Sequence, residues 1–144
     1  MVSTVRDEYP ETTEAVPLLE EDGVIVADDP ELKMWAVVRR DLQMPDGKIV
    51  PQAGHAFLDC GLQADRGVLE LYQATSKAKI SLRVKSEMQL LKMHDLCVAQ
   101  GLNTCLVQDA GKTFFADVPT FTMFAVGPCY RHELPRAVDK LPML

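Results

Sequence analysis

The chain has 144 residues, of which 47% are hydrophobic and 25% charged, with a formal net charge of −6. This length suffices for one hydrophobic core and is short for two, and the composition is that of an ordinary globular protein. No apolar run approaches the roughly 18 residues that a membrane-spanning helix needs. The first residues also lack the basic start and apolar middle of a secretory signal.

The charge is unevenly distributed along the chain. Residues 1–32 hold ten Asp and Glu against one Arg, a net −9, whereas residues 33–144 hold fourteen Lys and Arg against eleven Asp and Glu, a net +3. The first segment also contains three prolines and no sustained periodicity, which predicts an acidic N-terminal arm (1–32) before one domain (33–144). Within the arm, "GVIVA" (23–27) would add a short edge strand. A mildly basic domain permits an anionic partner without requiring one.

The four cysteines are Cys60, Cys97, Cys105 and Cys129. They form no CxxC pair and have no neighbouring histidine at ligand spacing. This pattern indicates reduced core or half-core residues in a cytoplasmic protein and argues against a structural zinc site.

In chain order, the domain alternates between strands and helices. Runs rich in β-branched and aromatic residues predict strands at 33–39, 77–84, 103–109 and 119–128. Helices are expected at 48–61, 62–76 and 86–101, and after the break at Pro135. The first of these should have Pro51 in its first turn and end at Gly61, and the third should begin on Ser86 and end at Gly101. The alternation predicts an α/β fold, a three-layer-like sandwich with a mixed four-stranded β-sheet flanked by helices.

The triplet Gly111-Lys112-Thr113 has the last three letters of a phosphate-binding P-loop. That motif needs another glycine five residues earlier, where this chain has Leu106. The residues between them read as a strand ending on Asp109, whose carboxylate would repel a phosphate. A P-loop nucleotide hydrolase is therefore excluded.

Two groups of polar residues are candidates for a functional site. Lys48, Gln52 and His55 are spaced i, i+4 and i+7, which places them on one helical face; the alternative is a solvated face with a partly buried histidine. Asp109 ends a buried strand, and antiparallel pairing of the next strand would bring Thr113 and Thr122 near it. The alternative for Asp109 is an Asx turn, in which its side chain hydrogen-bonds its own turn.

Three segments together resemble the type 2 peptidyl-tRNA hydrolases: "KMWAVVRRDLQMPDGKIVPQAGHA", "QDAGKT" and "TFTMFAVGP". The resemblance covers nearly all of residues 33–144 and excludes the acidic arm. It implies an enzyme that needs no metal or cofactor and hydrolyses the ester between a peptide and the 3′-terminal ribose of tRNA. The alternative is a catalytically weak domain of the same fold that acts as a protein- or RNA-interaction module.

The resemblance also implies roles for individual residues. Lys48 would stabilise the developing oxyanion, and Asp109 would orient water or pair with Lys48. Thr113 and Thr122 match the family's site threonines, and Gln52 matches a hydrogen-bonding partner.

His55 also matches the family, and a histidine general base would be worth roughly 10² to 10⁴ in rate. Its separation of two helical turns from Lys48 favours a supporting role instead. No serine or cysteine has a base at suggestive spacing, which argues against a covalent nucleophile.

The chain departs from the family pattern at three places. Val50-Pro51 stands where the family usually has two small residues before the glutamine, and Ala53-Gly54 replaces the commoner Cys-Ser or Cys-Ala before the histidine. Lys112 replaces an arginine, which keeps the charge but loses bidentate phosphate geometry. Arg39, Arg40 and Lys112 are expected to contact tRNA phosphates, and plain surface charge is the alternative for each. The expected partner is peptidyl-tRNA, and a homodimer is left open.

Overall fold

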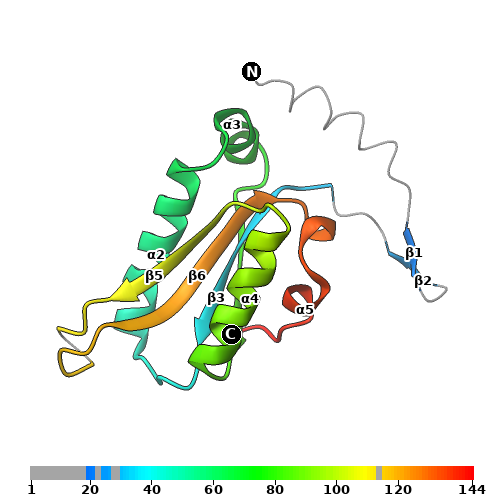
Figure 1. Ribbon diagram of the computed structural model, residues 1–144. Helices are drawn as coiled ribbons and strands as arrows, with labels where there is room; N and C mark the ends of the chain where they lie inside the picture. The colour runs from blue at the N-terminus through cyan, green and yellow to red at the C-terminus, as the bar shows by residue number, and fades with distance from the viewer. Residues whose placement is uncertain (1–18, 22–23, 27–29, 113–114) are drawn as a thin grey trace.

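The computed structural model describes residues 19–21, 24–26, 30–112 and 115–144 (Figure 1). β1 (Leu19–Glu21) and β2 (Val24–Val26) pair antiparallel in a two-stranded sheet of their own. The strand expected within 23–27 is present as β2, but it pairs with β1 and not with the four-stranded sheet. Only two residues separate the two strands in the sequence, which favours a local partner.

Residues 33–144 contain a mixed four-stranded sheet with the spatial order β4-β3-β6-β5. The strands are β3 (Lys33–Arg39), β4 (Ala78–Val84), β5 (Thr104–Asp109) and β6 (Thr120–Cys129). β3 and β4 run parallel, whereas β6 is antiparallel to both β3 and β5. Parallel neighbours need a long crossover connection, and two helices provide it here. The strands predicted from sequence agree with these to within one residue at each end.

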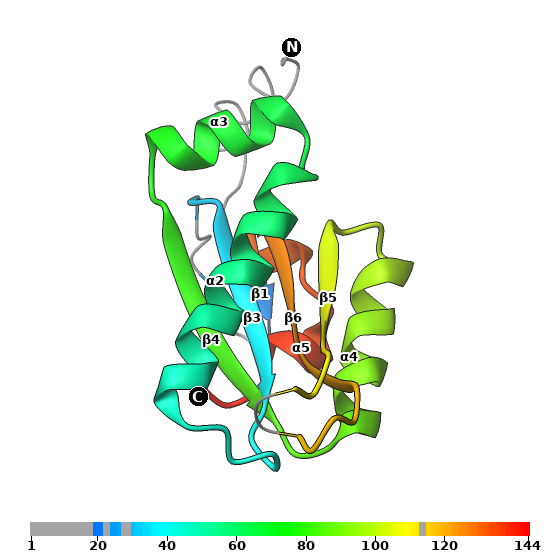
Figure 2. The same ribbon diagram turned by 90° about the vertical axis from the view of Figure 1, so that its left-hand side faces the viewer.

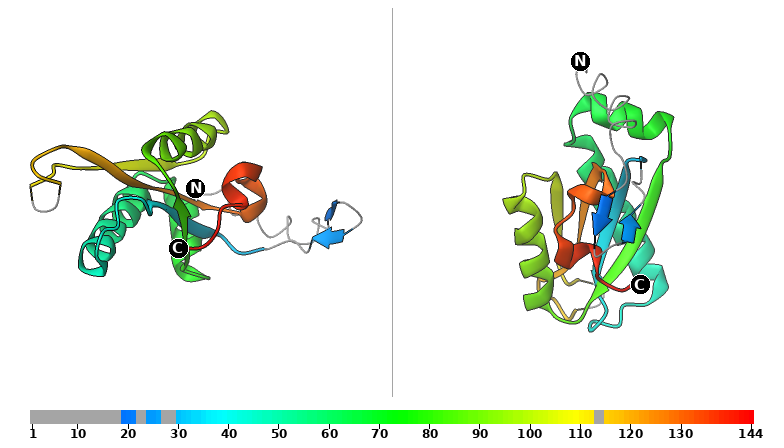
Figure 3. Two further views of the ribbon diagram at one scale, coloured as in Figure 1. Left: turned by 90° about the horizontal axis from the view of Figure 1, so that it is seen from below. Right: turned by 90° about the vertical axis from the view of Figure 1, so that its right-hand side faces the viewer.

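Helices cover both faces of the sheet, as Figures 2 and 3 show. One face packs against α2 (Asp46–Leu62) and α3 (Arg66–Ala74), and the other against α4 (Glu87–Ala99), the short turn η1 (Arg131–Glu133) and α5 (Arg136–Asp139). Side chains of β3 alternate between two cores: Met34, Ala36 and Val38 face α2, and Trp35 and Val37 face α4. The predicted α/β sandwich with a mixed four-stranded sheet is confirmed.

Local sequence signals explain where α3 and α4 begin. The Ser86 hydroxyl accepts the N–H of Gln89 (3.0 Å) before α4, and the Asp65 carboxylate accepts the N–H of Val68 (3.1 Å) before α3. Such caps satisfy amides that have no partner within the helix. The second helix is thus shorter than the predicted 62–76, because Asp65 begins it.

The start of α2 differs from the prediction. The helix begins at Asp46, and the negative charge of this side chain interacts favourably with the positive end of the helix dipole. The N–H groups of Lys48 and Ile49 donate to the carbonyl of Pro45 (2.8 and 3.0 Å). Pro51 consequently lies in the second turn and not the first, where it has no N–H to donate to the carbonyl four residues earlier.

A β-bulge in β6 changes which side chains face α2. Val107 pairs with Met123 but the next residue of β5, Gln108, pairs with Phe121, so Thr122 is an extra residue on β6. Phe121 packs in the α4-side core, and Met123 in the α2-side core. The bulge lets Thr122 also face α2, as bulges beside functional sites often re-aim a side chain.

Candidate active site

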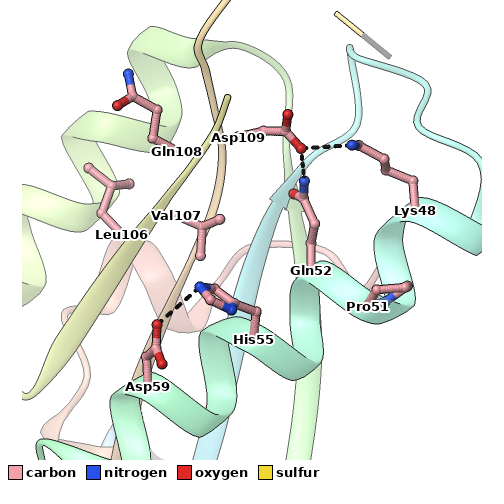
Figure 4. Close-up of a pocket in the computed structure, with 9 residues that line it drawn as sticks. All are labelled: Lys48, Pro51, Gln52, His55, Asp59, Leu106, Val107, Gln108 and Asp109. Atoms are coloured by element: carbon pink, nitrogen blue, oxygen red, sulfur yellow. Dashed lines mark hydrogen bonds and ion pairs between the residues drawn. The ribbon is translucent and has the colours of Figure 1, made fainter. Parts of the chain in front are cut away.

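A cleft of about 560 Å³ lies between α2 and β5 (Figure 4). Its lining residues are Lys48, Pro51, Gln52, His55, Asp59, Leu106, Val107, Gln108 and Asp109. The volume falls within the range of small-molecule binding sites. The predicted helical stripe of Lys48, Gln52 and His55 therefore faces the same cleft as Asp109.

Asp109 is the centre of the polar cluster. Its Oδ2 atom lies 2.7 Å from the Nζ atom of Lys48 and accepts a hydrogen bond from Nε2 of Gln52. Its Oδ1 atom accepts the N–H of Gly111 (2.6 Å). Both interpretations of this aspartate hold at once, because one oxygen bonds its own turn while the other faces α2.

The surroundings of Asp109 keep it ionised. The hydrogen bond from Lys48, the N–H of Gly111, the charge of Lys48 and the bond from Gln52 all lower the pKa of the Asp109 carboxyl below its ordinary value of 3.8, against a smaller opposing effect of burial. The side chains of Asp109 and Lys48 are only 11% and 17% exposed, so solvent screens the pair weakly. A carboxylate with a lowered pKa is a weak general base and a good partner for a cation.

Removing the ammonium should therefore raise the pKa of Asp109. We expect Lys48→Ala to shift its titration, followed by carboxyl-carbon NMR, to higher pH. Because the folded pKa is depressed, this group stabilises the fold in full above its ordinary pKa, and the contribution is lost as pH falls through the folded value. The variant should therefore lose less stability than wild type as pH falls below the ordinary pKa, because its Asp109 titrates closer to the unfolded value. The surface control Lys92→Ala should leave the Asp109 titration unchanged. An unchanged titration in Lys48→Ala would contradict the pairing.

Thr122 extends the cluster into the core. It is fully buried, and its hydroxyl donates to Oε1 of Gln52 (2.6 Å). Since that bond holds the amide oxygen, the amide nitrogen of Gln52 is directed to Asp109. Lys48, Asp109, Gln52 and Thr122 thus form one connected network.

The structure gives His55 a different position from the network. Its Nε2 atom lies 3.1 Å from Oδ2 of Asp59, one helical turn further along α2, and its side chain is 66% exposed. Among the contacts shown, His55 bonds Asp59 and lines the cleft, which fits a supporting role better than that of a buried base.

Lys48 is also flanked by the ring of Phe115, whose centroid lies 5.7 Å from Nζ. Thr113 lies outside the described residues.

The residues predicted to contact tRNA lie in two places. Arg39 is held by carboxylates, with Oδ2 of Asp41 at 2.7 Å and Oε1 of Glu87 at 3.4 Å, and its side chain is 10% exposed. Arg40 is exposed and donates to the carbonyl of Leu144 (3.0 Å). Both arginines line a second cleft of about 340 Å³ beside the start of α2.

Lys112, the third predicted contact, is exposed in the connection from β5 to β6. In the chain it comes directly after Gly111, whose N–H holds Asp109. Lys112 thus lies three residues after Asp109 in the chain, whereas the two arginines line the neighbouring cleft.

Sequence reasoning missed two contributors to the site. Gly111 has φ +84°, and a Cβ atom there would collide with the carbonyl of Val118, so the N–H that holds Asp109 comes from a position only glycine fits. Asp59 was also missed, although its spacing of i+4 from His55 was a readable signal.

Two further observations concern the described ranges 19–21, 24–26, 30–112 and 115–144. They contain no group of three or more His, Cys, Asp or Glu residues placed to hold a metal ion. No helix in this part of the chain has the length and apolar character required to cross a membrane.

The family model described as "Peptidyl-tRNA hydrolase PTH2" matches residues 32–144. The chain belongs to the type 2 peptidyl-tRNA hydrolase family. This confirms the resemblance drawn from the three motifs.

Individual members of this family match about the same share of this chain. A "Peptidyl-tRNA hydrolase" from Aeropyrum pernix is 40% identical over 118 residues, covering 77% of this chain and 94% of the relative. A protein of the same name from Methanopyrus kandleri is 34% identical over 114 residues, covering 78% and 97%. "Probable peptidyl-tRNA hydrolase 2" from Drosophila melanogaster is 37% identical over 116 residues; 78% of this chain matches 61% of that longer protein.

Proposed function

We propose that this protein hydrolyses the ester bond of peptidyl-tRNA, releasing the peptide and recycling the tRNA. The observation that supports it most is the Lys48–Asp109 ion pair, braced by Gln52 and Thr122 at an open cleft. Relatives that carry the name peptidyl-tRNA hydrolase strengthen the proposal. Nothing favours the alternative of a catalytically weak interaction module. The unusual Pro51 lies in the helix, and Lys48 still reaches Asp109.

The mechanism places charge where the reaction develops it. A water molecule attacks the ester carbonyl carbon, and the Lys48 ammonium stabilises the negative charge that forms on the carbonyl oxygen. Asp109 holds Lys48 in position and orients the water. The carbon–ribose oxygen bond then breaks, and the proton from the water ends on the ribose hydroxyl. Gln52 and Thr122 fix the carboxylate.

The proposal is tested by incubating the protein with N-acetyl-aminoacyl-tRNA and measuring free N-acetyl-amino acid and intact tRNA. We expect turnover that is unchanged after the enzyme has been treated with a chelator and passed over a desalting column, because the residues named supply the charge stabilisation. A folded protein that releases nothing would refute the hydrolase and turn attention to the interaction module.

Thr122→Val tests the role of the buried hydroxyl. Valine has nearly the same volume, but it leaves Oε1 of Gln52 without its donor. An unsatisfied buried group costs about 1–3 kcal/mol, so we expect kcat to fall by roughly tenfold as Gln52 loses its orientation. Thr122→Ser should restore most of the rate, and Thr120→Val, at a partly exposed position, is the matched control. Equal rates for Thr122→Val and wild type would remove Thr122 from the mechanism.

We infer that tRNA binding uses two exposed side chains: Arg40, which lines the second cleft, and Lys112, which lies three residues after Asp109 in the chain. Arg39 contributes less, because Asp41 and Glu87 neutralise it. Each phosphate contact should reduce the slope of log K against log salt by about one when it is removed. Thr113 is proposed as a further site residue because it follows Lys112 in the family motif.

We also propose that the acidic arm competes with tRNA for the basic domain. Deleting residues 1–31 should then tighten tRNA binding at low salt and have less effect at high salt, because screening weakens the competition. Replacing the arm with an uncharged Gly/Ser segment of equal length is the control for its bulk. Unchanged affinity after deletion would identify the arm as a solubility tail instead.

The cellular context follows from the thiols and the substrate. The four cysteines are free, which fits the reducing environment of the cytoplasm, where we propose that the enzyme acts on peptidyl-tRNA. A homodimer remains a proposal that sedimentation measurements would decide.

A further inference from the structure

The two edges of the main sheet differ in how they are covered. Residues near the end of the chain lie along β4, where Leu82 and Met143 form an antiparallel bridge and the N–H of Leu144 donates to the carbonyl of Ser81 (2.9 Å). Within the described ranges, no strand pairs with the outer edge of β5. An uncovered edge is a template for an added strand.

The outward-pointing main-chain groups of β5 can be identified from the ladder. The N–H of Gly127 donates to the carbonyl of Asn103 (3.0 Å), which makes these residues a hydrogen-bonded pair just before β5 begins. Bonded and non-bonded pairs alternate along an antiparallel ladder. The N–H and C=O groups of Thr104 and Leu106 therefore point away from β6. Because the extra residue of the bulge, Thr122, lies on β6, the alternation continues along β5 and the same holds for Gln108.

One end of this edge is closed and the other leads into the reactive cluster. Nε2 of Gln63 donates to the carbonyl of Thr104 (2.6 Å) and occupies that group. Leu106 and Gln108 line the cleft that ends at Asp109. Figure 4 shows this strand lying opposite α2, which forms the other wall.

We propose that the peptide part of the substrate docks as an additional strand on the outer edge of β5. This rests on the proposed function, which places the ester carbonyl beside Lys48 and Asp109. The peptide's carboxyl end then lies at the Asp109 end of β5, so the peptide runs parallel to β5. Main-chain bonding does not depend on side chains, which suits an enzyme whose substrates differ in peptide sequence.

The length of the open edge limits how many peptide residues can raise kcat/KM. Between Asp109 and the closed carbonyl of Thr104, at about 3.3 Å per residue, there is room for roughly three peptide residues. Lengthening the peptide to three residues should raise kcat/KM, and further residues should add little.

The first experiment leaves the protein unchanged and compares four substrates: N-acetyl-alanyl-tRNA, N-acetyl-trialanyl-tRNA, and two forms of the second, each N-methylated at one of its two internal alanine amides. One hydrogen bond gained should make kcat/KM for the trialanyl substrate roughly two- to tenfold higher than for the short one. Methylation of one of the two internal alanine amides should remove that gain, and methylation of the other should not, since alternate amides face the edge.

A matched pair of variants tests the same edge from the protein side. Gln108→Pro removes the outward N–H without touching the ladder to β6, whereas Gln108→Ala removes only an exposed side chain and keeps the N–H. The ratio of kcat/KM for the long and short substrates should fall toward one in the proline variant and stay as in wild type in the alanine variant. Circular dichroism shows whether both variants are folded. If the proline variant is not folded, the methylated substrates on the unchanged protein test the docking.

The outcomes separate this inference from the function beneath it. Release of all four substrates at equal kcat/KM, or equal effects of the two methylations, would overturn docking on β5 and leave the hydrolase intact. Failure to release any substrate would overturn the proposed function itself.

Discussion

Lys48→Ala is expected to lower kcat for release of N-acetyl-amino acid from tRNA by about 10²–10³-fold, the usual loss when one group that stabilises an oxyanion is removed. The ammonium lies 2.7 Å from Oδ2 of Asp109 and is largely shielded from water. Its removal takes away the positive charge and leaves the Asp109 carboxylate to repel the developing oxyanion. Both effects raise the barrier.

The control for this loss is Lys92→Ala, which removes an exposed charge from α4 on the opposite face of the sheet. Its kcat should stay within about twofold of wild type, as for most surface changes. Thermal melting shows whether the Lys48 variant is folded at the assay temperature. A folded Lys48→Ala protein with a kcat near that of wild type would show that this ammonium does not stabilise the transition state.

Phe124→Ala is expected to cause the largest loss of stability, about 3–5 kcal/mol in the free energy of unfolding. Phe124 is fully buried at the centre of β6 and faces α4, where its ring meets the edge of His94 with centroids 5.5 Å apart. The truncation leaves a cavity between two rigid elements. Because a whole domain is stable by only about 5–15 kcal/mol, urea denaturation should show the loss clearly.

The same variant separates stability from activity. Phe124 faces away from the α2 side that holds the cleft, so kcat below the unfolding transition should stay close to that of wild type. Met88→Ala, at a residue that is 80% exposed on α4, should change the unfolding free energy by less than about 0.5 kcal/mol. A Phe124→Ala loss as small as that of Met88→Ala would mean that the α4-side core is not packed as described.

The sequence predicted the elements whose signals are local. β3 coincides with the run 33–39, and α4 begins after Ser86 as its cap requires. The helical stripe of Lys48, Gln52 and His55 follows from a period of 3.6 residues alone, so its position on one wall of the cleft was predictable.

The features that could not be predicted depend on contacts between distant segments. The run Phe121 to Gly127 is almost continuously apolar, so no alternation in it reveals the bulge that directs Thr122 to Gln52. Arg39 looked available for phosphate, but its partner Glu87 lies 48 residues away. The start of α2 was predicted two residues too late. The prediction placed Pro51 in the first turn, where proline is common, although Asp46 is also a signal for the start of a helix.

The most direct test of the central claim, that Lys48 and Asp109 act as one catalytic unit, is the kcat of a double variant. Lys48→Ala, Asp109→Asn and their combination are compared on N-acetyl-aminoacyl-tRNA. Residues that act together are strongly non-additive. The account predicts that the combined variant is scarcely slower than the slower single variant. A loss equal to the product of the two single losses would contradict it, because the two residues would then act independently.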